Sequence, residues 1–156
     1  MVQLVQVIHE GDELDTIRVL FREYGTELGE DLCFQGFDAE LGNPFKKYGP
    51  PAGALILALW EGEPAGCIAL TPMHEAGACE MKRLYVRPGY RQHGIGRLLV
   101  DALLEEARRR NYTSMKLDTL QRLQAAIRLY EQYGFVHIAP YYDNPIGDVV
   151  YMEKRL

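Results

Sequence analysis

A glycine-containing segment that joins an apolar run to an amphipathic one is the feature that most constrains the fold of this chain. Residues 84–97 read Leu-Tyr-Val-Arg-Pro-Gly-Tyr-Arg-Gln-His-Gly-Ile-Gly-Arg, which predicts a strand, a loop and the start of a helix. Gly94 and Gly96 have no Cβ, so the backbone can approach a ligand closely, and the helix adds the positive end of its dipole. The segment therefore predicts a binding site for an anion such as a phosphate.

Two well-known phosphate loops do not fit this segment. Gly89 and Gly94 have the outer spacing of a Walker loop, but the next positions hold Ile95 and Gly96 where that loop requires Lys and Ser or Thr. A dinucleotide-binding loop that starts at Gly94 would need glycine at Leu99, and no acidic residue lies at the distance expected for a ribose contact. Neither an NTPase nor a Rossmann site is expected.

The remaining pattern, Arg-x-x-Gly-x-Gly after a strand that ends in Leu-Tyr-Val, resembles the pyrophosphate loop of the GCN5-related N-acetyltransferases, the GNAT superfamily. A second segment, residues 125–135, resembles the late helix of that family, which ends in Leu-Tyr-x-x-x-Gly-Phe. The order of elements from Cys79 to Phe135 is that of the family's cofactor half, whereas the N-terminal part resembles the family in element order only. The resemblance implies acetyl-coenzyme A as the co-substrate.

The resemblance also assigns roles to residues. Backbone N–H groups of the loop and its basic side chains would hold the pyrophosphate. The residues assigned to this role are Arg91, Gln92, His93, Gly94, Ile95, Gly96 and Arg97. Backbone groups at the end of the preceding strand would contact the pantetheine arm, which places Leu84, Tyr85 and Val86 beside the cofactor. Tyr130 matches the tyrosine that protonates the departing thiolate in several family members, although a tyrosine on the inner face of a helix commonly belongs to the core.

The base that accepts the proton of the attacking amine is left open. Glu80, on the strand that leads to the loop, and Asp118, at the end of the following strand, are the two candidates. Strand alternation does not decide whether Glu80 faces the cleft, because this strand carries a bulge in the family. Leu123 stands where many relatives have an asparagine, so one polar contact with the cofactor is missing.

The acceptor side is predicted only in outline. Residues 140–145, together with Phe34, Gln35 and Phe37, are candidates for lining an acceptor pocket, with packing against the core as the equal alternative. A polyamine, an amino acid, an antibiotic, a protein N-terminus and a lysine side chain all stay open as acceptors. Whether the acyl group is acetyl or longer is open as well.

Hydrophobic periodicity predicts one α/β domain over residues 1–156, with a mixed and mostly antiparallel central sheet flanked by helices on both faces. The resemblance implies that this domain has the GNAT-like fold. Strands are expected at residues 2–8, 55–60, 64–71, 79–86, 115–119, 135–138 and 149–152. Helices are expected at residues 12–28, within 31–41, from 95 to 110, and before Gly134. Residues 42–53, which are rich in Gly and Pro, are expected to form a long surface loop.

Composition disfavours several function classes. Three cysteines, Cys33, Cys67 and Cys79, lack Cys-x-x-Cys spacing, and the four histidines are scattered, so neither a disulfide framework nor a metal site is expected. No apolar run approaches the roughly 20 residues that span a bilayer, and no signal peptide is recognised. A cytoplasmic protein without a membrane partner is therefore expected.

Charge is distributed unevenly along the chain. The net charge of −5 argues against a nucleic-acid partner. Residues 9–50 carry ten acidic and four basic side chains, whereas residues 82–110 carry eight basic and three acidic ones. The basic segment surrounds the glycine loop and suits a coenzyme with several phosphates. The acidic segment either attracts a cationic amine or forms solvated helix faces.

The sequence thus predicts an N-acetyltransferase that needs no metal and moves an acetyl group from acetyl-coenzyme A to a primary amine by direct attack in a ternary complex. The alternative is a non-catalytic acyl-CoA-binding sensor or regulatory module that keeps the loop without the transfer. The oligomeric state is open, with a homodimer as one alternative.

Overall fold

The computed structural model describes residues 1–32 and 36–156. Its strands are β1 (Val2–Gln6), β2 (Ala54–Trp60), β3 (Glu63–Pro72), β4 (Ala78–Val86), β5 (Ser114–Leu120), β6 (Val136–Ile138) and β7 (Val149–Arg155). Its helices are α1 (Asp12–Leu28), α2 (Phe37–Gly42), α3 (Pro44–Tyr48), α4 (Ile95–Arg109) and α5 (Gln124–Gln132), with a short 3₁₀ turn at Pro88–Tyr90. Within the described ranges, no helix combines the length and apolar character needed to cross a bilayer.

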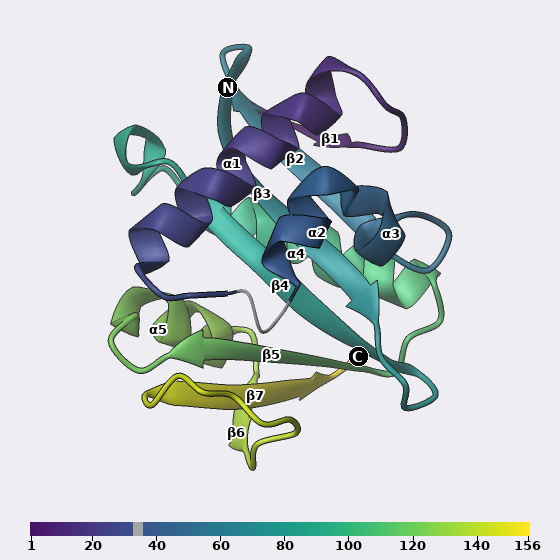
Figure 1. Cartoon of the computed structure of the whole chain (residues 1–156), viewed down its shortest axis with the longest axis vertical. Helices are drawn as coiled ribbons and strands as arrows, with labels where there is room; N and C mark the ends of the chain where they lie inside the picture. The colour runs from purple at the N-terminus through teal and green to yellow at the C-terminus, as the bar shows by residue number, and fades with distance from the viewer. Residues whose placement is uncertain (33–35) are drawn as a thin grey trace.

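The strands form one seven-stranded sheet in the order β1-β2-β3-β4-β5-β7-β6 (Figure 1). All neighbouring strands are antiparallel except β4 and β5, which run parallel because α4 connects them as a crossover. The hairpin between β2 and β3 turns at Glu61 and Gly62, which both have positive φ. The predicted mixed and mostly antiparallel sheet is confirmed.

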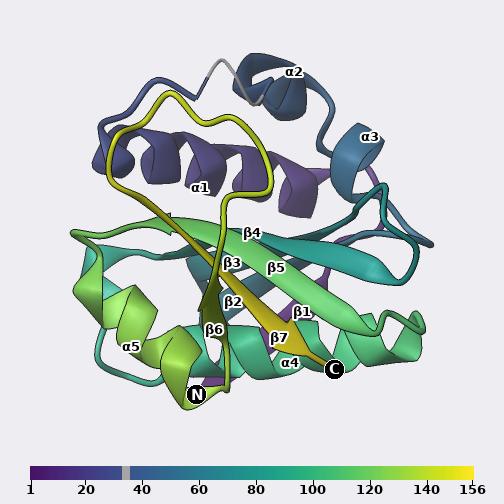
Figure 2. The ribbon, with the colours of Figure 1, turned by 90° about the horizontal axis from the view of Figure 1, so that it is seen from below.

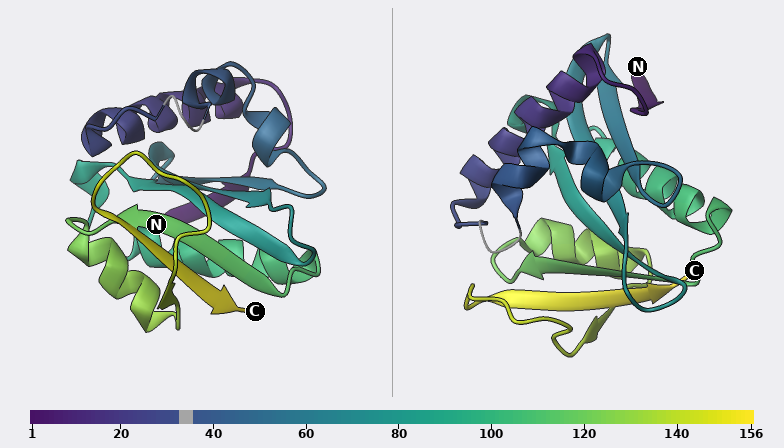
Figure 3. Two further views of the ribbon diagram at one scale, coloured as in Figure 1. Left: turned by 60° about the horizontal axis from the view of Figure 1, so that its bottom comes forward. Right: turned by 45° about the vertical axis from the view of Figure 1, so that its right-hand side comes forward.

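Helices cover both faces of the sheet, as predicted. Figure 2 shows α1, α2 and α3 on one side and α4 and α5 on the other, and Figure 3 shows the same layers from two further directions. Leu14, Ile17 and Phe21 of α1 pack on the first face, where they form one hydrophobic cluster. Leu99 and Leu103 of α4 belong to a second cluster on the opposite face. The sheet therefore separates two apolar cores.

Strand β4 carries a bulge in its middle. Cys67 of β3 lies opposite Tyr85, but Ala69, two residues later, lies opposite Lys82, so β4 contains one extra residue. Arg83 sits at this position with φ 60, in the left-handed region that few non-glycine residues adopt. The bulge that the family resemblance implies is present in this chain.

Strands β4 and β5 pair over a short distance and then part. Residues 78–80 of β4 pair with residues 114–116 of β5, and beyond this point the described strands have no ladder between them. Strand β4 nevertheless continues to Val86, and β5 continues to Leu120, where it is still paired with β7. The parting leaves an opening within the sheet next to the bulge.

The prediction of a surface loop at residues 42–53 is wrong for part of that range. Residues 44–48 form α3, which begins with Pro44 at a position where a missing N–H costs nothing. Tyr48 is fully buried, and its ring packs edge-on against Phe21 at a centroid distance of 5.9 Å. Pro44 and Gly49 flank this helix, and these residue types led to the prediction of a loop. Burial of Tyr48 between them stabilises a helix instead.

A buried ion pair ties the helices of the first face to the bulge. The Arg83 guanidinium donates to both carboxylate oxygens of Glu40 in α2, at 2.8 and 3.0 Å, and the two side chains are 2% and 1% exposed. The Tyr48 hydroxyl donates to the same carboxylate at 2.8 Å. The Glu40 carboxylate thus neutralises the buried charge of Arg83 at the bulge of β4.

We expect Glu40→Ala to lower the free energy of unfolding by about 3 to 5 kcal/mol, because it leaves the Arg83 guanidinium buried without its counter-charge. The measurement is urea unfolding followed by circular dichroism. Glu105→Ala is the control, since Glu105 pairs with Arg109 where both side chains are 65% exposed, and its removal is expected to cost less than about 1 kcal/mol. Equal losses in the two variants would contradict the prediction.

Candidate active site

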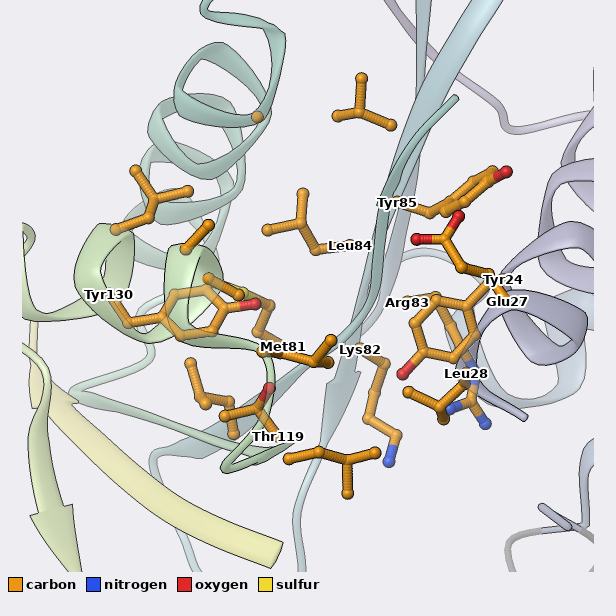
Figure 4. A pocket seen from close by; sticks show the side chains of 18 of the residues that line it. Tyr24, Glu27, Leu28, Met81, Lys82, Arg83, Leu84, Tyr85, Thr119 and Tyr130 are labelled. Carbon is orange, nitrogen blue, oxygen red and sulfur yellow. The ribbon is translucent and has the colours of Figure 1, made fainter. Parts of the chain in front are cut away.

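A cavity of about 690 Å³ occupies the place where β4 and β5 part. Its walls come from both strands, from α1, from the glycine loop, from the start of α5 and from the segment before β7. Figure 4 shows α5 with Tyr130 on one side of β4 and α1 with Tyr24 on the other. The cavity therefore reaches both faces of the sheet.

The glycine loop forms one end of the cavity. Gln92 and Gly94 both have positive φ, at 68° and 78°, so the chain turns sharply before α4 begins at Ile95. The Leu98 N–H donates to the carbonyl of Gly94, which makes the N–H groups of the three preceding residues the free amino-terminal donors of α4. Such donors, with the helix dipole behind them, suit a phosphate group.

The structure brings most of the predicted loop residues to the cavity wall. Those that line the cavity are Arg91, Gln92, Gly94, Ile95 and Gly96. His93 and Arg97 are not among the lining residues: the His93 ring packs against Trp60 at 5.0 Å, and the Arg97 guanidinium lies over the ring of Tyr133 at 5.6 Å.

Arg91 is already paired within the protein. Its guanidinium donates to the Glu27 carboxylate at 2.6 Å and to the carbonyl of Val86 at 2.8 Å. The first bond joins the loop to α1, and both Arg91 and Glu27 line the cavity. A phosphate at the loop would therefore meet a cation that a carboxylate holds in place.

The three predicted residues of β4 also line the cavity. Leu84 and Val86 pack toward the core beneath α4, whereas Tyr85 belongs to the core beneath α1. The Tyr85 hydroxyl donates to Glu23 at 3.1 Å. These residues keep β3 on one side, where Cys67 lies opposite Tyr85, but β5 no longer pairs with them on the other. The edge of β4 that β5 leaves uncovered therefore faces the cavity.

Tyr130 lies in the wall on the α5 side. Its ring points from α5 toward Met81 and Leu84 of β4 (Figure 4) and contacts Phe135 edge-on at 5.8 Å. Burial raises the pKa of the Tyr130 hydroxyl above its usual value. The hydroxyl therefore stays protonated well above neutral pH and remains able to donate a hydrogen bond.

The two candidate carboxylates differ in their access to the cavity. Asp118 lines the cavity, whereas Glu80 does not. The Tyr142 hydroxyl donates to Asp118 at 2.5 Å, and the Tyr141 hydroxyl donates to Glu80 at 2.7 Å. Alternation along β5 puts Leu117 in the core beneath α4, so its neighbour Asp118 points to the α1 face. Asp118 and Tyr130 therefore reach the cavity from opposite faces of the sheet.

Lys82 lies between the two carboxylates and was missed by the sequence reasoning. Its ammonium nitrogen is 3.6 Å from Asp118 and 3.9 Å from Glu80, and its side chain is 5% exposed. Strand β4 is apolar apart from Glu80, Lys82 and Arg83. Charged residues in a central strand require buried counter-charges, and this was the signal that could have revealed the cluster.

Of the predicted residues 140–145, Asn144 lines the cavity. Tyr141 and Tyr142 do not line it but donate to Glu80 and Asp118. Ile146 and Val149, which follow the predicted range, line the cavity as well. On the helical side, Phe37 is not a lining residue.

The Phe37 ring instead lies under the Arg83 guanidinium at 5.2 Å. Phe34 and Gln35 lie outside the described residues. The α1 side of the cavity is lined instead by Tyr24, Leu28 and Leu32, which the sequence reasoning did not select.

Neither described cysteine lies at the cavity. Cys67 and Cys79 are buried and unpaired, and Cys33 lies outside the described residues. Burial raises the pKa of Cys79 to about 12, so its thiol is neutral at physiological pH and is not an activated nucleophile. Among the described residues, no three His, Cys, Asp or Glu side chains converge as a metal site would require.

The chain is similar to known proteins in sequence and in fold. The model of the acetyltransferase (GNAT) family matches residues 15–135. An uncharacterized N-acetyltransferase of Schizosaccharomyces pombe is 49% identical over 145 residues, which make up 92% of this chain and 89% of that protein.

Two solved structures show the same fold. An acetyltransferase from Streptococcus agalactiae has a TM-score of 0.80 at 22% identity, with 99% of this chain and 98% of that chain covered. The PaiA N-acetyltransferase of Thermoplasma acidophilum, crystallised in complex with coenzyme A, has a TM-score of 0.74 at 17% identity, with 100% and 99% covered.

The buried tyrosines lead to a prediction about alkaline pH. Unfolded tyrosines lose their protons near pH 10, whereas burial raises the pKa values of Tyr130, Tyr141 and Tyr142 in the folded protein. Above about pH 10 the unfolded state binds fewer protons than the folded state, so the free energy of unfolding is expected to fall as the pH rises. Urea unfolding between about pH 9 and pH 11.5 measures this slope. Tyr141→Phe removes one contributing group and should flatten the slope; an unchanged slope in that variant would contradict the prediction.

Proposed function

Since the chain belongs to the acetyltransferase (GNAT) family and is an acyltransferase, we propose that it transfers an acetyl group from acetyl-coenzyme A to a primary amine by direct attack. One observation carries the proposal. The cavity between β4 and β5 has a phosphate-type loop at one end, and a tyrosine hydroxyl and a carboxylate reach it from opposite faces of the sheet. A reaction that removes a proton from one reactant and gives a proton to the other needs such a pair.

The residues present fit a coenzyme with a pyrophosphate. The N–H groups at the start of α4 and the Arg91 side chain would hold the phosphates, and the free edge of β4 at residues 84–86 would bond the amide groups of the pantetheine arm. A Cβ added at Gly94 would meet no atom within 4 Å, so the space in front of the loop is open. Bound acetyl-coenzyme A would supply an activated acetyl thioester.

Asp118 is the residue that we assign to the proton of the amine. An amine must be neutral to attack, and a carboxylate that lines the cavity can accept its proton. Glu80 is the weaker candidate, because it is outside the cavity wall and Lys82 lies between it and Asp118. The Tyr142 hydroxyl donates to the Asp118 carboxylate, and the Lys82 ammonium lies 3.6 Å from it.

Tyr130 is the residue that we assign to the departing thiolate. Its hydroxyl stays protonated because burial raises its pKa, and it reaches the cavity from the α5 face. A thiol has a pKa of about 8.5, which lies below that of tyrosine, so complete proton transfer is uphill. The hydroxyl acts chiefly by donating a hydrogen bond to the negative charge that develops on sulfur.

We expect Gly94→Glu to abolish binding of acetyl-coenzyme A, because a carboxylate in front of the loop repels the phosphates. The measurement is calorimetric titration of the purified protein. Gly89→Glu is the control, since it adds the same charge in the preceding turn at a residue that does not line the cavity. Gly94→Ala is a second control for the strain of a side chain at φ 78. Absence of binding to the wild type would overturn the proposal, and binding without transfer to any amine would favour an acyl-CoA-binding module.

We expect Tyr130→Phe to lower kcat by about a hundredfold or more while binding of acetyl-coenzyme A is retained, because only the developing thiolate loses a partner. Release of free thiol in the presence of a primary amine measures kcat. Tyr112→Phe is the matched control, because its hydroxyl donates to the carbonyl of Ala52 away from the cavity. A kcat that does not change in Tyr130→Phe would remove Tyr130 from the mechanism.

A further inference from the structure

The segment between β6 and β7 places a tyrosine and an asparagine against Asp118. We propose that Tyr142 and Asn144 are positioning residues that hold and orient the Asp118 carboxylate through hydrogen bonds to its Oδ2. This inference rests on the function proposed above, in which Asp118 accepts the proton of the amine. Nothing in the family match or in the relatives assigns a role to either residue.

A chain of hydrogen bonds defines the direction of each group. The Ile146 N–H donates to the Asn144 side-chain carbonyl at 2.9 Å, so the amide nitrogen must point the other way. That nitrogen donates to the Tyr142 hydroxyl oxygen at 2.8 Å. Because the oxygen accepts this bond, its own proton is directed to Asp118, whose Oδ2 lies 2.5 Å away.

The other carboxylate oxygen of Asp118 accepts neither of these bonds. Oδ1 of Asp118 lies 3.6 Å from the Lys82 ammonium, which is longer than a hydrogen bond, and Asp118 belongs to the cavity wall. Tyr142 and Asn144 thus both donate to Oδ2, at 2.5 and 3.4 Å, whereas Oδ1 is the oxygen that pairs with Lys82.

Several other groups surround the same carboxylate. Lys82 and Glu80 face it from β4, and Tyr151 of β7 lies opposite it in the ladder. The negative charge of Asp118 also contributes to the raised pKa values of Tyr24 and Tyr130 across the cavity. All these groups stay in place when the Tyr142 hydroxyl is removed, so a change in the titration of Asp118 reports on that hydroxyl.

The chain supplies its own comparison in the neighbouring residue. Tyr141 donates to Glu80 in the same way that Tyr142 donates to Asp118. The rings of Tyr141, Tyr142 and Tyr151 pack together at centroid distances of 5.2 to 5.6 Å. Removing either hydroxyl therefore perturbs the same aromatic cluster, but only Tyr142 touches the carboxylate that lines the cavity.

The test compares Tyr142→Phe with Tyr141→Phe by two readouts. The first is the side-chain carboxyl ¹³C signal of Asp118 in the full chain as a function of pH, assigned with Asp118→Asn. The second is kcat/KM against pH for transfer from acetyl-coenzyme A to the best acceptor among L-aspartate, L-lysine, spermidine and phenethylamine. Neither readout responds to a purely structural loss of active protein, which changes amplitudes and leaves midpoints where they were.

In Tyr142→Phe, we expect the acid limb of kcat/KM to move to higher pH and the ¹³C signal of Asp118 to follow it, because the carboxylate loses a hydrogen-bond donor. Asn144→Ala keeps the Tyr142 hydroxyl but removes the amide that orients it, so we expect a smaller shift of the acid limb to higher pH. Tyr141→Phe should leave the acid limb at its wild-type position.

Two results would overturn the inference. One is an acid limb that stays in place in both Tyr142→Phe and Asn144→Ala, and the other is a shift in Tyr141→Phe as large as that in Tyr142→Phe. Failure of the proposed function has a different signature. In that case no amine is acetylated by the wild type, while the ¹³C titration still shows whether Tyr142 and Asn144 control Asp118.

Discussion

The parting of β4 from β5 is the constraint on which the rest of the structure depends. A sheet that stayed paired would bury the backbone of both strands and leave no space between them. Here the parallel ladder stops after residue 80 of β4, and the bulge at Arg83 turns the following residues away from the ladder. Backbone donors and acceptors on the edge of β4 thereby face the cavity. The cavity exists because one strand pairing in the sheet is incomplete.

Ion pairs between distant segments hold this opening in shape. The acidic N-terminal segment and the basic middle segment of the sequence meet across the α1 face, where Arg87 pairs with Glu23, 64 residues away in the chain. Arg83 with Glu40 and Arg91 with Glu27 follow the same scheme. These carboxylates are therefore engaged with the protein itself, which argues against a role for them in attracting a cationic amine. The unequal charge distribution is a feature of how the layers are joined.

Local sequence signals were enough to predict most of the fold, including the glycine loop that precedes α4. The apolar periodicity of residues 95–109 predicts α4, and the glycines at positions 94 and 134 predict the turns beside helices. Each of these signals depends only on residues that are close together in the sequence. The cluster around Lys82 could not be predicted in the same way, because its partners lie on β5 and near β7 and meet only after folding. The choice between Glu80 and Asp118 depended on which side chain reaches the cavity, and alternation fails next to a bulge.

The position of β7 has a consequence for the order in which the site is built during synthesis. Strand β7 lies between β5 and β6 although it follows both in the chain, so β6 has no neighbour in the sheet until β7 leaves the ribosome. The seven residue pairs between β5 and β7, including Asp118 with Tyr151, also cannot form before β7 is made. The glycine loop and α4 have already been synthesised by then. The residues that surround Asp118 are therefore complete only after the last strand has been made.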